Sequence, residues 1–245
     1  MARYVIITAF IMFLGCTKQY HLADVKPRTY RIEKASFPVD VKTAEIIEPY
    51  KLQLDVTMNE VISYNESEMV KGKPSSTLTN WFADVLLDET QKLVADSLDF
   101  AIQNYGGIRL GSVPKGNITV GKVYELMPFD NIMYITEMDG NTVQMLFDKM
   151  AESGGWPVSK NVYFEIAFGK AKNILIKKKT LDPTHIYKVA IPDYIANGGD
   201  NMTFMKGLKA HNTNALIRDM IIQHLKTMKQ QNKTIIPDNE KRIIE

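Results

Sequence analysis

The sequence NIMYITEMDGNTVQMLFDKMAES, residues 131–153, decides the expected fold. Residues 131–138 are rich in the β-branched and aromatic types that strands favour, and Asp139-Gly140 predicts a turn after them. Beyond the turn, apolar residues recur at helical spacing as far as about residue 153. This apolar face consists of Val143, Leu146, Phe147 and Met150. The stretch therefore predicts a strand, a turn and an amphipathic helix in succession.

Other segments extend this mixture of strands and helices. A second helix is expected at residues 75–95, with Ser76 or Thr77 as its N-cap, and a third at 214–228. Strands are expected at residues 98–102, 162–168, 173–176 and 187–191. Because strands and helices neither alternate regularly nor segregate, the sequence predicts a single α+β domain of mixed β-sheets packed with helices.

The N-terminus has the pattern of a secretion signal. An apolar run at residues 5–14 follows Arg3 and is too short to cross a bilayer, which takes a helix of about 20 residues. Cys16, the only cysteine, follows this run directly, as at a bacterial lipoprotein processing site. An ordinary cleaved signal is the alternative reading, and an internal disulfide is excluded.

These features predict four segments. We expect a signal peptide at residues 1–15, a lipid-anchored tether at 16–44, a folded domain at 45–230 and a C-terminal tail at 231–245. The protein would then be a periplasmic or cell-envelope lipoprotein, anchored to a membrane through Cys16.

Charge gives no reason to expect a nucleic-acid partner. The formal net charge is +2, and 24% of the residues are charged. The longest basic run, Lys177-Lys178-Lys179, precedes a proline turn and is expected to be a solvated hairpin end rather than a phosphate-binding patch.

Three short segments combine glycine or proline with aromatic and polar side chains. They are residues 104–109 (NYGGIR), 127–131 (MPFDN) and 193–200 (DYIANGGD). Glycines allow close approach of backbone N–H groups, arginine offers a forked donor to an anion, and a loop aromatic can stack on a flat ligand. Each segment also has a structural explanation: a turn with an ion-paired Arg109, a core-capping Phe129, or Asp200 as a turn or cap residue.

The sequence lacks the patterns of a catalytic centre. The four histidines are scattered, and none belongs to a grouping with metal-ligand spacing. A Gly-x-Ser-x-Gly elbow and a P-loop are also absent. We therefore expect no catalytic residue, metal site or cofactor in this chain. The histidines are His21, His185, His211 and His224.

In the order and spacing of these segments, the chain resembles the C-terminal domain of the bacterial 5′-nucleotidase / UDP-sugar hydrolase family. The resemblance runs from about Val61 to Lys206. It rests on residues 78–84, 104–109, 118–119, 128–131, 139–140 and 193–200. The chain departs from the family at Tyr105 and Asn201, where glycine is usual.

The resemblance implies a role for each site residue. Phe129 and Tyr194 would be two rings that clamp a nucleoside, and Asn131 would contact the base. Asp200 would accept hydrogen bonds from ribose hydroxyls, and Arg109 would contact phosphate. Asn104, Gly106 and Gly107 would complete the substrate-binding site, and Lys71 and Lys73 stand where the family places basic residues before the first helix.

In that family an N-terminal metallophosphatase domain binds two metal ions and performs the hydrolysis. The resemblance therefore implies that this chain is the substrate-binding component of a 5′-nucleotidase-type hydrolase in nucleotide breakdown, acting with a separately encoded metallophosphatase and inactive alone. The divalent metals would belong to the partner. A non-enzymatic nucleoside- or nucleotide-binding lipoprotein for capture or sensing is the alternative, and a degenerate domain kept for protein contacts is a third.

Overall fold

The structure is a computed structural model that describes residues 24–31 and 39–245. The expected signal peptide and Cys16 lie outside these residues. The chain divides after Ile47 into an N-terminal unit and a body, residues 48–245. Helix α2 (Val41–Met58) begins in the first unit and ends in the second, so helical structure starts within the expected tether.

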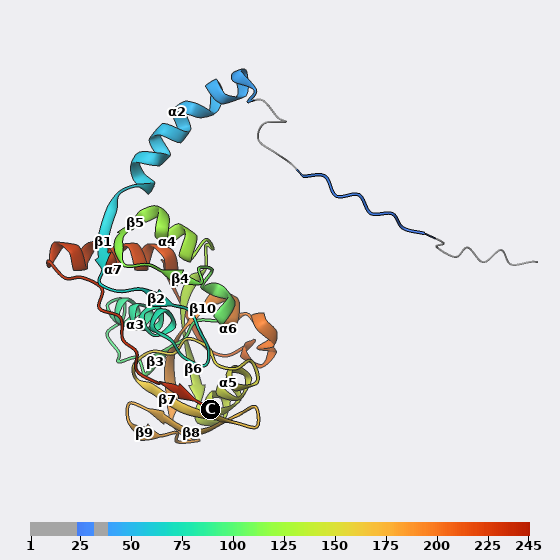
Figure 1. The fold of residues 1–245 in the computed structure, drawn as a ribbon. Coiled ribbons are helices and arrows are strands. Elements are labelled where there is room, and N and C mark those ends of the chain that lie inside the picture. The colour runs from blue at the N-terminus through green and yellow to red at the C-terminus, as the bar shows by residue number, and fades with distance from the viewer. Residues whose placement is uncertain (1–23, 32–38) are drawn as a thin grey trace, which may run out of the picture. The chain divides into compact units, whose positions relative to one another are not determined.

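The body contains two four-stranded sheets, two small two-stranded sheets and several helices (Figure 1). The helices are α3 (Thr77–Gln91), α4 (Val120–Leu126), α5 (Gly140–Glu152), α6 (Asp193–Ala196) and α7 (Ile217–Gln230). The central sheet has the order β11-β6-β10-β3, with β3 (Phe100–Ala101), β6 (Ile132–Asp139), β10 (Ile186–Pro192) and β11 (Ala210–Leu216). The mixed α+β prediction is confirmed.

The remaining strands form smaller or peripheral sheets. The second four-stranded sheet has the order β12-β7-β8-β9, with β7 (Val162–Ala167), β8 (Lys170–Ile176), β9 (Lys179–Thr180) and β12 (Ile243–Ile244). In Figure 1 it lies at the end of the body that carries the C-terminus. The two-stranded sheets pair β1 (Val61–Asn65) with β5 (Gly116–Thr119) and β2 (Met69–Val70) with β4 (Ser112–Val113).

The central sheet separates two hydrophobic cores because side chains alternate between the faces of a strand. Ala190 of β10 belongs to the core that contains α3, α4 and α7 residues. Its neighbours Val189 and Ile191 belong to the core that contains residues of α5, β7 and β8. Both faces of the sheet are therefore covered.

The predicted elements are found with shifted ends. Helix α3 begins after Ser76, whose backbone N–H donates to Thr79 Oγ1 at 2.8 Å. The predicted turn at Asp139-Gly140 is wrong, because β6 leads straight into α5 and Asp139 caps it, accepting from the Thr142 N–H at 2.8 Å. Residues 214–216, predicted to be helical, end strand β11 instead. Lys177 and Lys178 form the predicted hairpin end between β8 and β9, both with positive φ.

Four strand ends meet at one edge of the central sheet. β3 and β10 are parallel, with Ala190 opposite Ala101, so their C-terminal ends lie together. β6 is antiparallel to both β10 and β11, and its first residue, Ile132, lies opposite Leu216, the last residue of β11. The segments that leave or enter this edge are residues 102–109, 127–131, 193–200 and the start of α7.

Residues 231–245, set apart above as a tail, pack into the body. Arg242 is 1% exposed and donates to both carboxylate oxygens of Asp84 at 2.7 and 2.8 Å. It also donates to Asp238 at 2.8 Å and to the carbonyl of Val158 at 3.0 Å. This buried guanidinium ties the C-terminal segment to α3, and β12 continues it into the second sheet.

Replacing this guanidinium should destabilise the body. We expect Arg242→Ala to lower the free energy of unfolding by about 3–5 kcal/mol, because it removes a 1% exposed guanidinium and leaves Asp84, which is 22% exposed, without its charged partner. Urea denaturation measures the change, with Lys241→Ala, an exposed neighbour, as control. A loss no larger than that of the control would show that residues 231–245 do not stabilise the body.

Candidate functional site

All eight residues that the sequence analysis assigned to substrate binding line one cavity of about 560 Å³. They come from three loops at the edge of the central sheet where the four strand ends meet. Asp130, to which no role was assigned, lines the same cavity. The residues are Asn104, Gly106, Gly107, Arg109, Phe129, Asn131, Tyr194 and Asp200.

The first loop is a 3₁₀ turn, Tyr105–Gly107, directly after the buried residues Gln103 and Asn104. A Cβ on Gly107 would lie 1.8 Å from Gln103 Nε2 and 2.8 Å from Asn104 Oδ1, so a larger residue here would displace these two buried amides. Neither Gly106 nor Gly107 has a positive φ. Close packing against Gln103, rather than backbone freedom, explains the second glycine.

Phe129 follows Pro128 on the second loop and is 37% exposed. It belongs to neither hydrophobic core and is not among the partly buried residues packed against them, which disfavours the alternative of a core-capping ring. The guanidinium carbon of Arg109 lies 5.1 Å from the centroid of the Phe129 ring, close enough for a cation–π contact. This contact, with a 3.4 Å hydrogen bond to the Gly106 carbonyl, places Arg109 beside the aromatic part of the cavity.

Arg218, at the start of α7, binds the loop that carries Phe129. Its Nη2 donates to Asp130 Oδ1 at 2.6 Å and its Nη1 to the Phe129 carbonyl at 3.3 Å. The guanidinium also lies 4.2 Å from the centroid of the Tyr124 ring. The sequence analysis missed this residue, because an arginine on an amphipathic helix gives no sign that it will be buried.

Tyr194 lies in α6, near the start of the third segment, and is 47% exposed. A Cβ on Gly199 would lie 2.5 Å from Tyr194 Cζ, so glycine is needed for the ring to rest on this backbone. The Tyr194 hydroxyl donates to Asp200 Oδ1 at 3.0 Å and accepts from the Asp200 N–H at 3.2 Å. The ring is thus fixed at its hydroxyl end and against Gly199.

A chain of side-chain hydrogen bonds joins the first loop to the third. Gln103 Nε2 donates to Asn104 Oδ1 at 2.9 Å, and Asn104 Nδ2 donates to Asp200 Oδ2 at 2.8 Å. With Tyr194 on Oδ1, each oxygen of Asp200 has one partner and keeps a lone pair for a ligand. Gln103 was missed above because its partner lies beside it in a buried layer that no sequence pattern marks.

Asn131 is also held in place, since its Nδ2 donates to Asp193 Oδ1 at 2.8 Å. One N–H of the amide therefore bonds to α6, and the side-chain carbonyl oxygen is left as an acceptor for a ligand.

Three cations lie close together at the first loop. Lys71 Nζ lies 4.0 Å and Lys73 Nζ 4.7 Å from the centroid of the Tyr105 ring. Lys71 donates to the Ile108 carbonyl at 2.6 Å, and Lys73 to the Ser153 carbonyl. Burial, followed by the charges of Arg109 and Lys73, lowers the pKa of Lys71. Among the described residues no carboxylate forms an ion pair with these three cations, so the cluster favours an anion.

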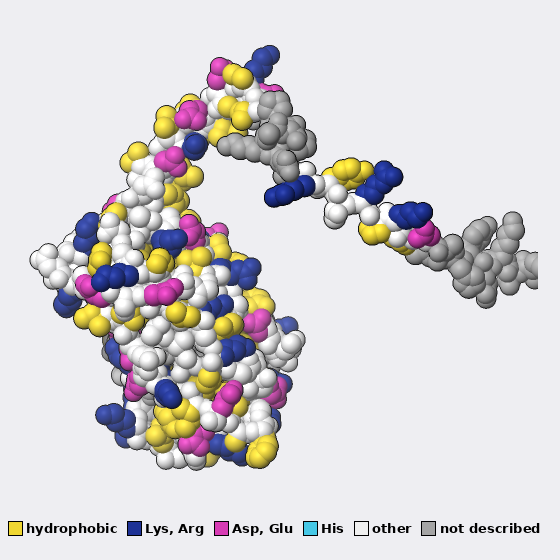
Figure 2. All heavy atoms as spheres, in the orientation of Figure 1, with side chains coloured by type: hydrophobic (Ala, Val, Ile, Leu, Met, Phe, Trp, Pro, Cys, Tyr) yellow, Lys and Arg dark blue, Asp and Glu magenta, His cyan; other side chains and the backbone are white. Residues whose placement is uncertain are grey.

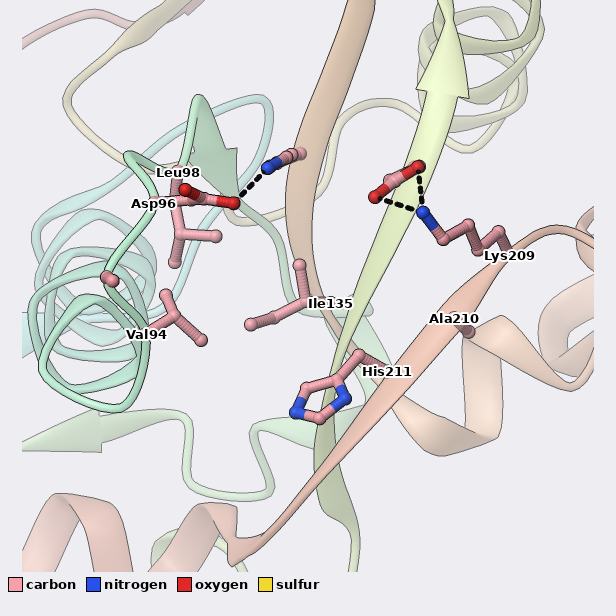
Figure 3. Close-up of a pocket in the computed structure, with 10 residues that line it drawn as sticks. Val94, Asp96, Leu98, Ile135, Lys209, Ala210 and His211 are labelled. Atoms are coloured by element: carbon pink, nitrogen blue, oxygen red, sulfur yellow. Dashed lines mark hydrogen bonds and ion pairs between the residues drawn. The ribbon is translucent and has the colours of Figure 1, made fainter.

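A second cavity, of about 480 Å³, lies beside β6 and β11 (Figure 3). Leu98 and Ile135 are among its apolar lining residues. Its charged residues form two ion pairs, Lys209 with Glu137 at 2.9 Å and Lys188 with Asp96. Because the lysines and carboxylates pair with each other, His211 is the one ionisable lining residue left without a partner among the described residues. The first cavity is therefore the stronger candidate site.

Within residues 24–31 and 39–245, no group of three or more His, Cys, Asp or Glu side chains is placed to hold a metal ion. His224 lies 2.6 Å from Glu89 Oε1, and His185 packs edge-on against Tyr187, so both have structural contacts. No helix in the same part of the chain is both long and apolar enough to cross a membrane.

Comparison with known proteins identifies the domain. The model of the family described as "5′-nucleotidase, C-terminal domain" matches residues 56–207, more than half of the chain. Protein UshA of Salmonella pullorum is 31% identical over 154 residues, which cover 61% of this chain and 27% of that protein. The 5′-nucleotidase of Vibrio vulnificus is 33% identical over 113 residues, 44% of this chain and 20% of that protein.

Among solved structures, a 5′-nucleotidase precursor from Thermus thermophilus matches with a TM-score of 0.71 and 26% sequence identity. The match covers 86% of this chain and 44% of that one, so the chain spans less than half the length of each of these relatives. With the family match, the shared fold and the cavity built from its three loops, the chain belongs to the 5′-nucleotidase C-terminal domain family.

Proposed function

We propose that the cavity binds a nucleoside or nucleotide, and that the chain is the substrate-binding component of a 5′-nucleotidase-type phosphohydrolase. One observation carries this proposal: three loops distant in sequence bring two half-exposed rings, an arginine and a carboxylate to one cavity. A volume of about 560 Å³ is within the usual range for small-molecule sites, roughly 300–1,000 Å³.

The polarity of the cavity matches the parts of a nucleotide. Phe129 and Tyr194 offer ring faces for the base, and Asp200 keeps lone pairs for ribose hydroxyls. Arg109, with Lys71 and Lys73 nearby, supplies positive charge for phosphate. The residue roles implied by the family resemblance are thus compatible with one bound nucleotide.

Hydrolysis would require chemistry that these residues do not provide. Metal ions in phosphohydrolases supply an activated water and neutralise developing charge, and the described part of this chain offers no set of ligands for them. We therefore place the metals and the chemical step on a separate metallophosphatase domain or subunit. This chain would contribute positioning, which is itself a large share of catalysis.

The location of the protein is part of the proposal. Cys16, at the end of the apolar N-terminal run, would carry a lipid anchor and hold the domain at the cell envelope.

The two rings provide the main test. We expect Phe129→Ala and Tyr194→Ala each to weaken adenosine binding by about tenfold or more, because base–aromatic stacking is worth about 1–3 kcal/mol. Isothermal titration calorimetry measures the affinity. Both variants should unfold near the wild-type temperature, unlike the core variant Phe147→Ala, which should lose about 3–5 kcal/mol. Unchanged affinity in both ring variants would contradict the binding site.

Arg109 tests the phosphate end of the site. We expect Arg109→Ala to weaken AMP binding by about tenfold, because a charge-assisted hydrogen bond is lost, and to leave adenosine binding nearly unchanged. Lys172→Ala, which removes an exposed positive charge from β8, controls for the change in net charge. Equal losses for AMP and adenosine would show that Arg109 does not contact phosphate.

The division of labour predicts that the purified chain releases no phosphate from AMP or a UDP-sugar in the presence of Mn²⁺, Zn²⁺ or Co²⁺. A colorimetric phosphate assay measures this, with Phe129→Ala purified in parallel to reveal a contaminant. Metal-dependent turnover that the variant loses would overturn the proposed division. If a metallophosphatase domain does not turn over AMP faster when this chain is added, the capture or sensing alternative is favoured for that pair.

A further inference from the structure

Asp130 presents a fixed carboxylate to the cavity. Arg218 holds its Oδ1 at 2.6 Å, yet 80% of the Asp130 side chain is exposed. The second oxygen is thus free to meet a ligand beside the Phe129 ring. Arg218 itself offers little to that ligand, because its side chain is 9% exposed and its two Nη atoms already donate to Asp130 and the Phe129 carbonyl.

The side-chain amide of the next residue, Asn131, also offers an acceptor to the cavity. Asn131 Nδ2 is engaged by Asp193 at 2.8 Å, which leaves Asn131 Oδ1, an acceptor, for a ligand. The other amide that lines the cavity, Asn104, donates to Asp200. Next to the ring, the Asp130 carboxylate and Asn131 Oδ1 are therefore acceptors, while one Asn131 N–H is already used by Asp193.

A base that stacks on Phe129 would place its edge near these acceptors. An exocyclic amino group donates hydrogen bonds to them. An oxo group at the same position turns its own lone pairs towards the carboxylate, and the ring N–H beside it supplies one donor where an amino group supplies two. Sites built to pair with a hydrogen-bonding group discriminate against analogues that cannot make the bond. Here the oxo lone pairs would also face the negative charge of Asp130.

This inference rests on the nucleoside-binding function proposed above. We propose that the cavity selects bases with an amino group at purine C6 or pyrimidine C4, adenine and cytosine, over their oxo counterparts, hypoxanthine and uracil. Asp130 is the specificity-determining residue, and Arg218 is the positioning residue that holds it.

The test compares two matched pairs of nucleosides on the wild-type chain by calorimetric titration. Adenosine should bind about tenfold or more tightly than inosine, and cytidine than uridine, because each amino group gains a hydrogen bond to a charged acceptor. This comparison needs no variant, so it does not depend on the folding of one.

Asp130→Asn supplies the sharper result. Asparagine can still accept from Arg218 through its oxygen while it presents an N–H₂ donor to the cavity. The preference should therefore fall to about equal affinity or reverse towards inosine and uridine. Asp96→Asn makes the same change at a lysine-paired carboxylate in the second cavity and should keep the wild-type preference.

Three negative outcomes are distinguishable. If the wild-type chain binds adenosine and inosine equally, and Phe129→Ala weakens both, the base preference is wrong while nucleoside binding stands. If Asp130→Asn keeps the wild-type preference, Asp130 does not determine it and the inference fails. If no nucleoside binds to the wild-type chain, the proposed function fails and the inference fails with it.

Discussion

The register of the central sheet is the constraint on which the site depends. β3 and β10 run parallel, and β6 runs antiparallel to both β10 and β11, so three strands end at the edge where β6 begins. The loops at that edge carry every residue that lines the candidate cavity. A shift of one residue in the pairing of β6 would exchange its two faces, moving Met133 and Ile135 away from α3 and α7. The two hydrophobic cores therefore fix the register, and the register brings the loops together.

Much of the fold follows from local sequence patterns. The strand expected at 131–138 is β6, and the helix expected at 75–95 is the shorter α3. The predictions fail where one local sequence pattern is compatible with two different structures. Asp139-Gly140 suits a turn, but the same aspartate also caps a helix, and the structure uses the cap. Residues 214–216 continue the apolar spacing of α7 but complete a strand, since pairing with β6 overrides helical periodicity.

The residues that line the site could be predicted from the sequence, but the residues that hold them in place could not. Glycine, proline and aromatic residues mark the three loops in the sequence, but only the family resemblance joined them into one site. Arg218 lies 88 positions from Asp130, and Arg242 lies 158 from Asp84. Contacts at such separations depend on the tertiary arrangement, so no window of sequence reveals that these arginines are buried. The C-terminal segment was taken for a tail for the same reason.

The surface of the body helps to explain why the cavity can discriminate between ligands. On the face shown in Figure 2, side chains of both charges are interspersed, so no extended field of one sign dominates that face. Selectivity must then come from short-range contacts. Lys71, Lys73 and Arg109 can make such contacts with an anionic ligand. Among the described residues, no carboxylate forms an ion pair with them, so their charges are not neutralised within the chain.

The cavity also keeps its polar groups in place without a ligand. Asp200 is held by Asn104 and Tyr194, Asn131 by Asp193, and Asp130 by Arg218. Ordering side chains at an interface costs about 0.5–1.5 kcal/mol each when it happens on binding. Here the side chains are already ordered by their partners in the folded chain, so ligand binding does not have to supply this free energy. A chain that contributes positioning and leaves the chemistry to another domain gains most from this arrangement, since its share of catalysis depends on how precisely the ligand is held.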